Sequence, residues 1–228
     1  DRTLGTSVIQ QSPNIDRIEG GAVRGVSLFH SFQEFNVGEG RRVEFAPLDG
    51  IENIFSRVTG SNASNINGTL KVLGNANLFL LNPNGILFGP NAKLDIPGSF
   101  VASTASSLLF KDGVEFSATN PQGLPLLKIS LPIGLQFGSN PRGIEMQNVN
   151  LLDVEPGVTR ALVGGNVTLD GSGLRARGGR VELGGLAEAG TVNLVNKDGN
   201  FSFSFPLGIN RSDVELKNGA VVNVRYTK

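Results

Sequence analysis

Few residues in this chain have the types and spacing that catalysis requires. His30 is the single histidine, and the surrounding segment LFHSF is mostly apolar, which favours a packed structural role over membership of a triad. The aspartates that could pair for acid–base work are scattered and mostly lie next to glycine or in a turn: Asp95, Asp112, Asp153 and Asp170. The sequence therefore predicts that the chain is not an enzyme and has no catalytic residues.

Cofactor and metal sites are equally poorly supported. The chain has no cysteine, which removes disulfide, zinc-thiolate and thiol-nucleophile chemistry. The calcium-binding GGxGxDxUx repeat, the Walker loop and the GxSxG motif are all absent. One charged group, made of Arg175, Arg177, Arg180 and Glu182, could resemble the strand face of a β-helical polysaccharide enzyme, but a solvated surface explains it more simply. We expect no cofactor and no metal.

The elements that would position any site are short strands between turns. In Ala76–Ser106, apolar runs alternate with Asn, Pro and Gly corners at nearly even spacing, and we expect strands at Leu78–Leu80, Ile86–Phe88, Leu94–Ile96 and Phe100–Ala102. Between the first two, Pro83 fixes one backbone angle and Asn84-Gly85 readily reverses the chain. This pattern predicts the coils of a stacked β-solenoid.

We divide the chain into four zones of a single domain, 1–228. Residues 1 to about 45 are expected to cap the first coil, 46–106 to form the first regular coils, and 107–147 to leave the rod as antiparallel strands, because this zone is rich in proline. Further coils are expected over 148–228. Their predicted strands are Val167–Leu169, Leu174–Ala176, Val181–Leu183, Val192–Leu194, Val214–Leu216 and Val222–Val224, with Phe201–Phe205 as an aromatic strand covering part of the rod.

Composition and charge limit the classes of partner. The formal net charge is +0, with 20 basic and 20 acidic residues, so we expect neither nucleic-acid binding nor electrostatic capture by an anionic membrane. No run of about 18 apolar residues is present, so we expect no membrane-spanning helix. The absence of cysteine suits an exported chain and a cytosolic chain alike. We expect a monomer.

The segment NPNGI, Asn82–Ile86, resembles the signature of the two-partner secretion domain at the N-terminus of filamentous-haemagglutinin-like exoproteins. Similar matches are HSFQEFNVGEG (30–40), NIFSRVTGSNASNINGTL (53–70), with Ser56 in place of the usual Asn, and GSFVAST (98–104). The resemblance covers roughly residues 14–120. The second family motif, NPNL, is missing, because the segments at 62–65 and 75–78 lack the proline, so the chain looks closer to the branch without NPNL.

The resemblance implies a right-handed parallel β-helix with an N-terminal cap and extra-helical antiparallel strands. It also implies a secretion module that the periplasmic POTRA domains of a dedicated outer-membrane transporter, of the TpsB type, recognise while the chain is unfolded. The protein would then be secreted or held at the cell surface of a Gram-negative type of envelope. We expect a targeting peptide to precede Asp1 and the natural protein to continue beyond Lys228.

By the same resemblance, nine residues are candidates for transporter recognition or fold nucleation: Phe29, Phe32, Phe35, Asn36, Asn82, Pro83, Asn84, Gly85 and Ile86. The NPNGI segment has two compatible interpretations, a tight β-helix corner stabilised by Asn side chains and a direct contact with the transporter. Three other classes stay open as alternatives: an adhesin surface that binds glycans or host matrix, a β-helical carbohydrate-active enzyme, and a purely structural scaffold.

Overall fold

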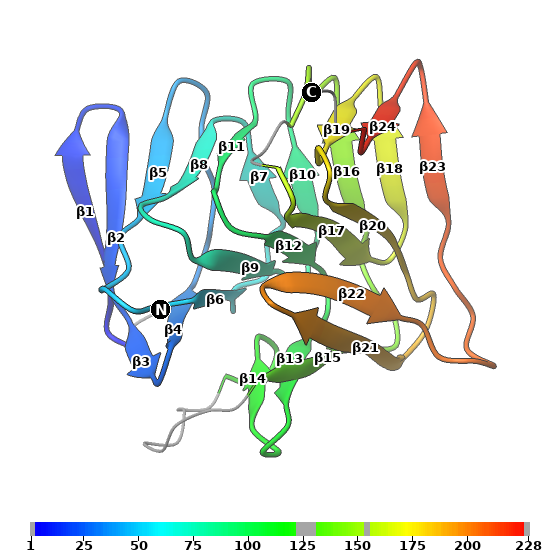
Figure 1. The fold of residues 1–228 in the computed structure, drawn as a ribbon, viewed down its shortest axis with the longest axis horizontal. Helices are drawn as coiled ribbons and strands as arrows, with labels where there is room; N and C mark the ends of the chain where they lie inside the picture. The colour runs from blue at the N-terminus through cyan, green and yellow to red at the C-terminus, as the bar shows by residue number, and fades with distance from the viewer. Residues whose placement is uncertain (1–2, 122–130, 153–155, 226–228) are drawn as a thin grey trace.

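The computed structural model describes residues 3–121, 131–152 and 156–225, and in these residues it contains β-strands and no helix (Figure 1). Most strands pair in parallel with strands about 21 to 27 residues away, as Phe55 does with Phe79 and Leu70 with Leu94. The chain therefore winds as a parallel β-helix with three faces, and a complete coil contributes one strand to each face. Val37 in the first coil and Leu152 in the fourth make single bridges where a strand is missing.

The three faces are built from strands of unequal length. The first face contains β4 (Ser27–Phe32), β6 (Asn53–Val58), β9 (Asn77–Leu81), β12 (Phe100–Ser103), β17 (Thr159–Gly164) and β20 (Arg180–Gly185). The second contains β7 (Ser64–Ile66), β10 (Ile86–Phe88), β16 (Ile144–Gln147), β18 (Val167–Asp170) and β23 (Val214–Lys217). The third contains β5 (Arg42–Phe45), β8 (Thr69–Val72) and β11 (Lys93–Asp95), and later coils place β19 (Gly173–Arg175) beside β24 (Val221–Asn223).

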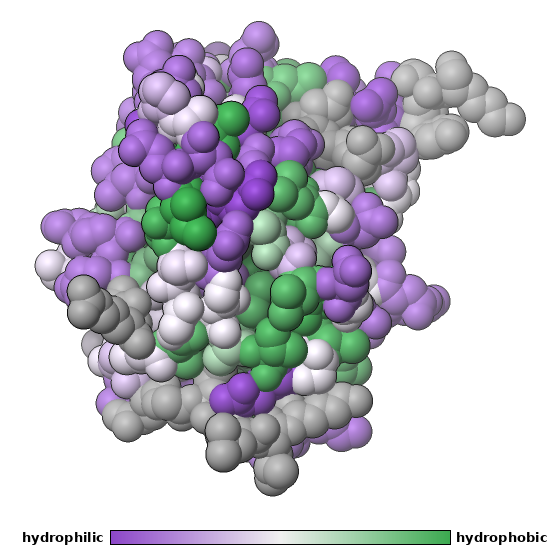
Figure 2. Space-filling model, turned by 90° about the vertical axis from the view of Figure 1, so that its left-hand side faces the viewer, coloured by the Kyte–Doolittle hydropathy of each residue, from purple (hydrophilic) through white to green (hydrophobic). Residues whose placement is uncertain are grey.

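The N-terminal end is closed by three strands that make antiparallel pairings. β1 (Thr6–Ser12) and β2 (Ile15–Gly20) form an antiparallel hairpin, and β3 (Ala22–Arg24) runs antiparallel to β4. β2 also pairs in parallel with β5, and β4 pairs in parallel with β6, so the range expected to be a cap, 1–45, contains both these strands and the first coil. Figure 2 looks onto this end, where apolar side chains stay visible among hydrophilic ones; the exposed apolar residues of this region include Val8, Ile9, Val23 and Leu48.

A second, antiparallel sheet lies outside the rod along the first face. It consists of β14 (Glu115–Ser117), β13 (Ser107–Phe110), β15 (Pro132–Phe137), β21 (Gly190–Lys197) and β22 (Asn200–Ser204). The strands β13–β15 leave the fourth coil between its first and second faces, and β21–β22 leave the sixth coil at the same place. The prediction of Val192–Leu194 as a coil strand is therefore wrong, because these residues pair antiparallel with β15 and β22. A short apolar–polar–apolar triplet looks the same in both kinds of sheet.

The first face is buried on both sides, which explains its continuous apolar sequence. In β9, Leu78 and Leu80 belong to the core inside the rod, whereas Phe79 and Leu81 belong to a second core between the rod and the antiparallel sheet. Strands covered on both sides lose the apolar–polar alternation of half-buried strands. The outward column Phe29, Phe55 and Phe79 joins three successive coils, with ring centroids 5.1 Å and 5.0 Å apart.

Candidate functional site

The NPNGI segment is the corner that joins β9 to β10, and its polar groups bond the coil below. Asn82 is fully buried, and its Nδ2 donates to Asn62 O at 3.0 Å and to Ser64 Oγ at 2.9 Å. Its Oδ1 accepts a hydrogen bond from Asn84 N at 3.0 Å, and Asn84 Nδ2 donates to Gly60 O at 2.8 Å. The two asparagines therefore replace the regular strand bonds that a corner lacks.

The remaining residues of the motif turn the chain and return it to the core. Pro83 is half-buried, and Gly85 has a φ of +114°, which L side chains rarely adopt. Gly85 N donates to Asn82 O at 3.1 Å and closes the turn. Ile86 is 2% exposed and lies in the rod core, so the corner ends with a buried apolar anchor.

The same edge of the rod continues as a ladder into the first coil. Asn36 is exposed, and its Oδ1 accepts a hydrogen bond from Asn65 N at 2.8 Å. Between the same two coils, Asn62 Nδ2 donates to Glu34 Oε1 at 3.0 Å. Amide side chains thus connect the first three coils along the corner between the first and second faces, and the asparagine-rich sequence at 62–67 lies at its centre.

The predicted phenylalanines do not form one cluster. Phe32 and Phe35 point into the rod with Phe45. The ring of Phe35 lies 5.1 Å from that of Phe32 and 6.0 Å from that of Phe45. Phe29 points the opposite way, into the second core, where its ring lies 5.1 Å from Phe116 of the antiparallel sheet. The structure therefore brings Phe32, Phe35 and Ile86 into one core and places Phe29 in the other.

His30 has the buried structural position that its neighbours suggested. Its ring lies between Phe32 and Phe45, at 6.0 Å and 5.5 Å, and Nδ1 is 3.1 Å from Thr6 Oγ1. Among the described residues, Nε2 has no hydrogen-bond partner. Burial lowers the pKa of His30 to about 4, because the charged imidazolium would lose its hydration.

The sequence reasoning missed two fully buried arginines that hold loops to the rod. Arg57 Nε donates to Ser31 Oγ at 2.9 Å, one terminal nitrogen donates to Ser117 O at 2.9 Å, and the guanidinium lies 4.6 Å from the centre of the Phe116 ring. Desolvation lowers its pKa to about 10. Arg160 donates to Gly98 O and Ile96 O at 2.7 Å and 2.8 Å. The available signal was a lone Arg inside an apolar strand, as in NIFSRV and TRALVG.

The remaining charged candidates form surface contacts. Asp95 pairs with Lys71, Asp170 lies 3.8 Å from Lys217, and Arg180 donates to Glu182 at 3.0 Å. Asp112 Oδ1 accepts a hydrogen bond from Val114 N within the same turn. Asp153 lies outside the described residues. Within the described part of the chain, no group of three His, Cys, Asp or Glu residues could hold a metal ion. These contacts offer no paired acid and base.

The chain is therefore a β-helical domain. It has a wound rod, an extra-helical sheet and an amide ladder along one edge of the rod. The family model for the TPS secretion domain, that is, the two-partner secretion domain, matches residues 1–228, and the chain belongs to this family. Its secretion domains are parts of exoproteins and not an enzyme family.

Similar curated proteins include two heme/hemopexin-binding proteins of Haemophilus influenzae. One, from strain Rd, is 32% identical over 82 residues, which cover 36% of this chain and 9% of that protein. The other is 31% identical over 67 residues, covering 29% and 7%. The matched segments thus span less than a tenth of these relatives.

Two solved secretion domains are similar to this chain. The HMW1 secretion domain from Haemophilus influenzae superposes with a TM-score of 0.65 at 19% identity, covering 98% of this chain and 54% of that one. The filamentous hemagglutinin secretion domain matches with a TM-score of 0.42 at 16% identity over 97% of both chains. The HMW1 likeness shows the fold. A helix able to cross a membrane is not found in the described residues.

Proposed function

We propose that this chain is the secretion module of a large exoprotein and that POTRA domains of a TpsB-type outer-membrane transporter recognise it before it folds. The observation that carries this proposal is the burial of the motif. Asn82 is fully buried with its amide atoms bonded inside the rod, and Ile86 is 2% exposed. A partner reaches these side chains only while the coil is open, so their contribution to recognition belongs to the unfolded chain.

The first-face strands supply the extended segments for such a contact. Sequences such as NLFLL in β9 carry apolar groups on both sides, and unfolded they have free backbone N–H and C=O groups along each edge. An extended segment of this kind adds to the exposed edge of a partner sheet, where main-chain bonds give affinity and alternate side chains give selectivity. After passage, the same strands pair with neighbouring coils.

Folding at the outer surface would then discourage return of the chain. Each coil presents a parallel edge for the next, and the N-terminal strands β1–β3 close the first coil. A folded state that forms only outside the cell removes unfolded chain there and so favours outward transport without ATP. The expected location is the medium or the cell surface, reached through the periplasm. The amide ladder and the buried Phe29, Phe32 and Phe35 are the parts expected to nucleate folding.

A secretion assay with the full exoprotein and the transporter encoded beside it tests this role. The variant Asn82→Ala with Asn84→Ala should lower the amount of exoprotein outside the cell, because it removes the corner ladder and any contact of these amides with the transporter. Asn91→Ala is the matched control, since Asn91 is an exposed asparagine in another corner of the same coil. Equal secretion of the double variant and the control would count against a role for the motif.

A further inference from the structure

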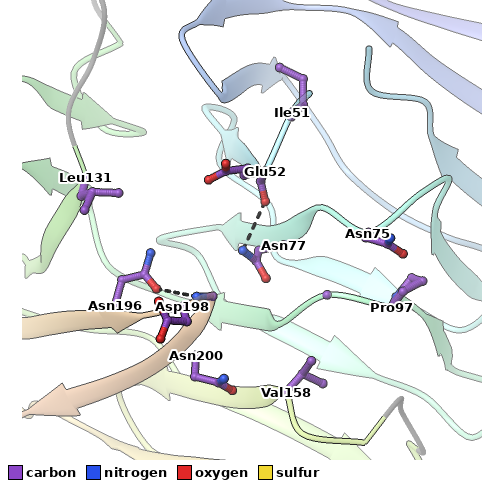
Figure 3. Close-up of a pocket in the computed structure, with 12 residues that line it drawn as sticks. Ile51, Glu52, Asn75, Asn77, Pro97, Leu131, Val158, Asn196, Asp198 and Asn200 are labelled. Carbon is purple, nitrogen blue, oxygen red and sulfur yellow. Dashed lines mark hydrogen bonds between the residues drawn. The ribbon is translucent and has the colours of Figure 1, made fainter. Parts of the chain in front are cut away.

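A groove of about 630 Å³ lies where the corners between the third and first faces meet the β21–β22 turn (Figure 3). One wall is formed by corners of four successive coils, including Glu52, Asn75 and Val158, and the other by the hairpin turn with Asp198 and Asn200. In Figure 3 the hairpin residues Asn196 and Asp198 lie at the left, and the rod corners run from Glu52 near the top, past Pro97 at the right, to Val158 near the bottom. The volume is within the range of about 300–1,000 Å³ that is typical of ligand sites.

The walls of this groove are fixed without a ligand. Ser99 Oγ donates to Gly199 O at 2.7 Å, and Thr159 and Phe201 exchange two hydrogen bonds of 3.1 Å and 3.0 Å. These bonds join the hairpin turn to the rod. Beneath the groove, the buried guanidinium of Arg160 holds the carbonyls on both sides of Pro97. A prearranged groove binds with less loss of conformational freedom.

The free groups that face the groove are carboxylates and amides. The side chains of Glu52, Asn75, Asp198 and Asn200 make no hydrogen bond or ion pair with the described residues, and no Lys or Arg of the described part of the chain lines the groove. Carboxylates only accept hydrogen bonds, whereas amides both accept and donate them. Together these side chains suit a ligand with hydroxyl groups, because a hydroxyl also both donates and accepts. The described lining residues therefore supply carboxylates and no cation, which disfavours an anionic ligand. Apolar side chains such as Ile51 give contacts for the C–H faces of sugar rings.

Two further features select the form of the ligand. Four corners at the spacing of neighbouring strands give a length of roughly 14 Å, which suits a short linear chain better than one sugar. The corner backbone is already paired, since Asn77 N donates to Glu52 O at 2.8 Å and Leu78 N to Ser99 O at 2.9 Å. A peptide strand would need unpaired backbone, so side-chain recognition of hydroxyls is favoured. We propose that this groove binds a neutral oligosaccharide through Glu52, Asn75, Asp198 and Asn200.

Titration of the folded domain with trisaccharides, followed by amide chemical shifts, tests this proposal. The probes are maltotriose, cellotriose and triacetylchitotriose at millimolar concentration, with trigalacturonate as the anionic comparison. At least one neutral probe should shift the amides of Glu52, Asn75 and the hairpin turn, and trigalacturonate should bind at least tenfold more weakly. The double variant Glu52→Ala with Asn75→Ala should weaken binding at least tenfold, because both side chains contribute hydroxyl contacts.

The controls separate loss of the site from loss of the fold. Both replaced side chains are exposed, so the variant should unfold at the wild-type temperature, and Asn91→Ala should bind normally. Asp198 has a φ of +54°, and Asp198→Asn keeps a residue that tolerates this conformation while removing the charge; it should weaken binding without unfolding. Absence of shifts with all three neutral probes, shifts confined to another surface, or equal binding of trigalacturonate would overturn the proposal. Occupation of the groove by a transporter peptide instead would reassign it to a protein partner.

Discussion

Replacement of Asn82 by Ala should cost about 3 kcal/mol of folding free energy. The change removes both donors to Asn62 O and Ser64 Oγ and the acceptor for Asn84 N. Ser64 is fully buried and loses a partner without access to water, whereas Asn62 is exposed and recovers one. A buried polar group left unbonded costs about 1–3 kcal/mol, and the lost bonds at half-buried Asn84 add about 1 kcal/mol. This is a large share of a total stability of about 5–15 kcal/mol.

Urea unfolding of the folded domain, monitored by far-UV circular dichroism, measures this cost. The midpoint should fall while the slope with urea stays constant, because the surface exposed on unfolding is nearly unchanged. Asn91→Ala should change the free energy of unfolding by less than about 0.5 kcal/mol, as expected for an exposed position. Asn82→Asp removes the donors and adds a buried charge, so it should destabilise at least as much as Asn82→Ala. If Asn82→Ala unfolds at the wild-type midpoint, the ladder does not stabilise the corner.

Three further predictions concern buried groups. Burial lowers the pKa of His30 from 6.5 to about 4, so the unfolded chain takes up the proton first as the pH falls. The stability that neutral His30 contributes is complete above pH 6.5 and falls by up to about 3 kcal/mol as the pH decreases to 4. Unfolding experiments at each pH should show this dependence in the wild type and not in His30→Gln. Arg57→Met should cost about 2–4 kcal/mol and speed proteolysis within β13–β15, because Ser117 O loses its buried donor; wild-type cleavage rates would contradict this. Gly185→Ala should destabilise the fold by roughly 3 kcal/mol or more, because the added Cβ would lie 1.7 Å from Gly164 O. Gly40→Ala should cost about 1 kcal/mol, because Gly40 has a φ of +70° but open space around it. Similar shifts in melting temperature for the two variants would refute the steric argument.

Local sequence was sufficient for the regular coils and for the corner. The strands expected around NPNGI correspond to β9–β12, because each short apolar run is bounded by residues that favour turns. The prediction of an all-β parallel rod with extra antiparallel strands is confirmed by the sheet pairing. These features depend on neighbouring residues, which a single sequence displays directly.

Features that depend on long-range packing could not be predicted in this way. Phe29 and Phe32 are three positions apart in one strand and enter different cores, because the antiparallel sheet covers the outer side of the first face. The same cover buries Arg57, whose partners Ser31 and Ser117 lie 26 and 60 residues away. The second excursion, β21–β22, has the same short apolar triplets as the coils. Only the partner strand distinguishes them.

Recognition of the unfolded chain by the transporter is tested most directly by comparing two states of the same domain. Binding to the isolated POTRA domains of the transporter encoded beside it would be measured by fluorescence anisotropy, with the domain either native or held unfolded in urea that leaves the POTRA domains folded. The account predicts clearly tighter binding of the unfolded chain, weakened by Asn82→Ala with Asn84→Ala but not by Asn91→Ala. Equal or tighter binding of the native domain, or no binding in either state, would contradict it.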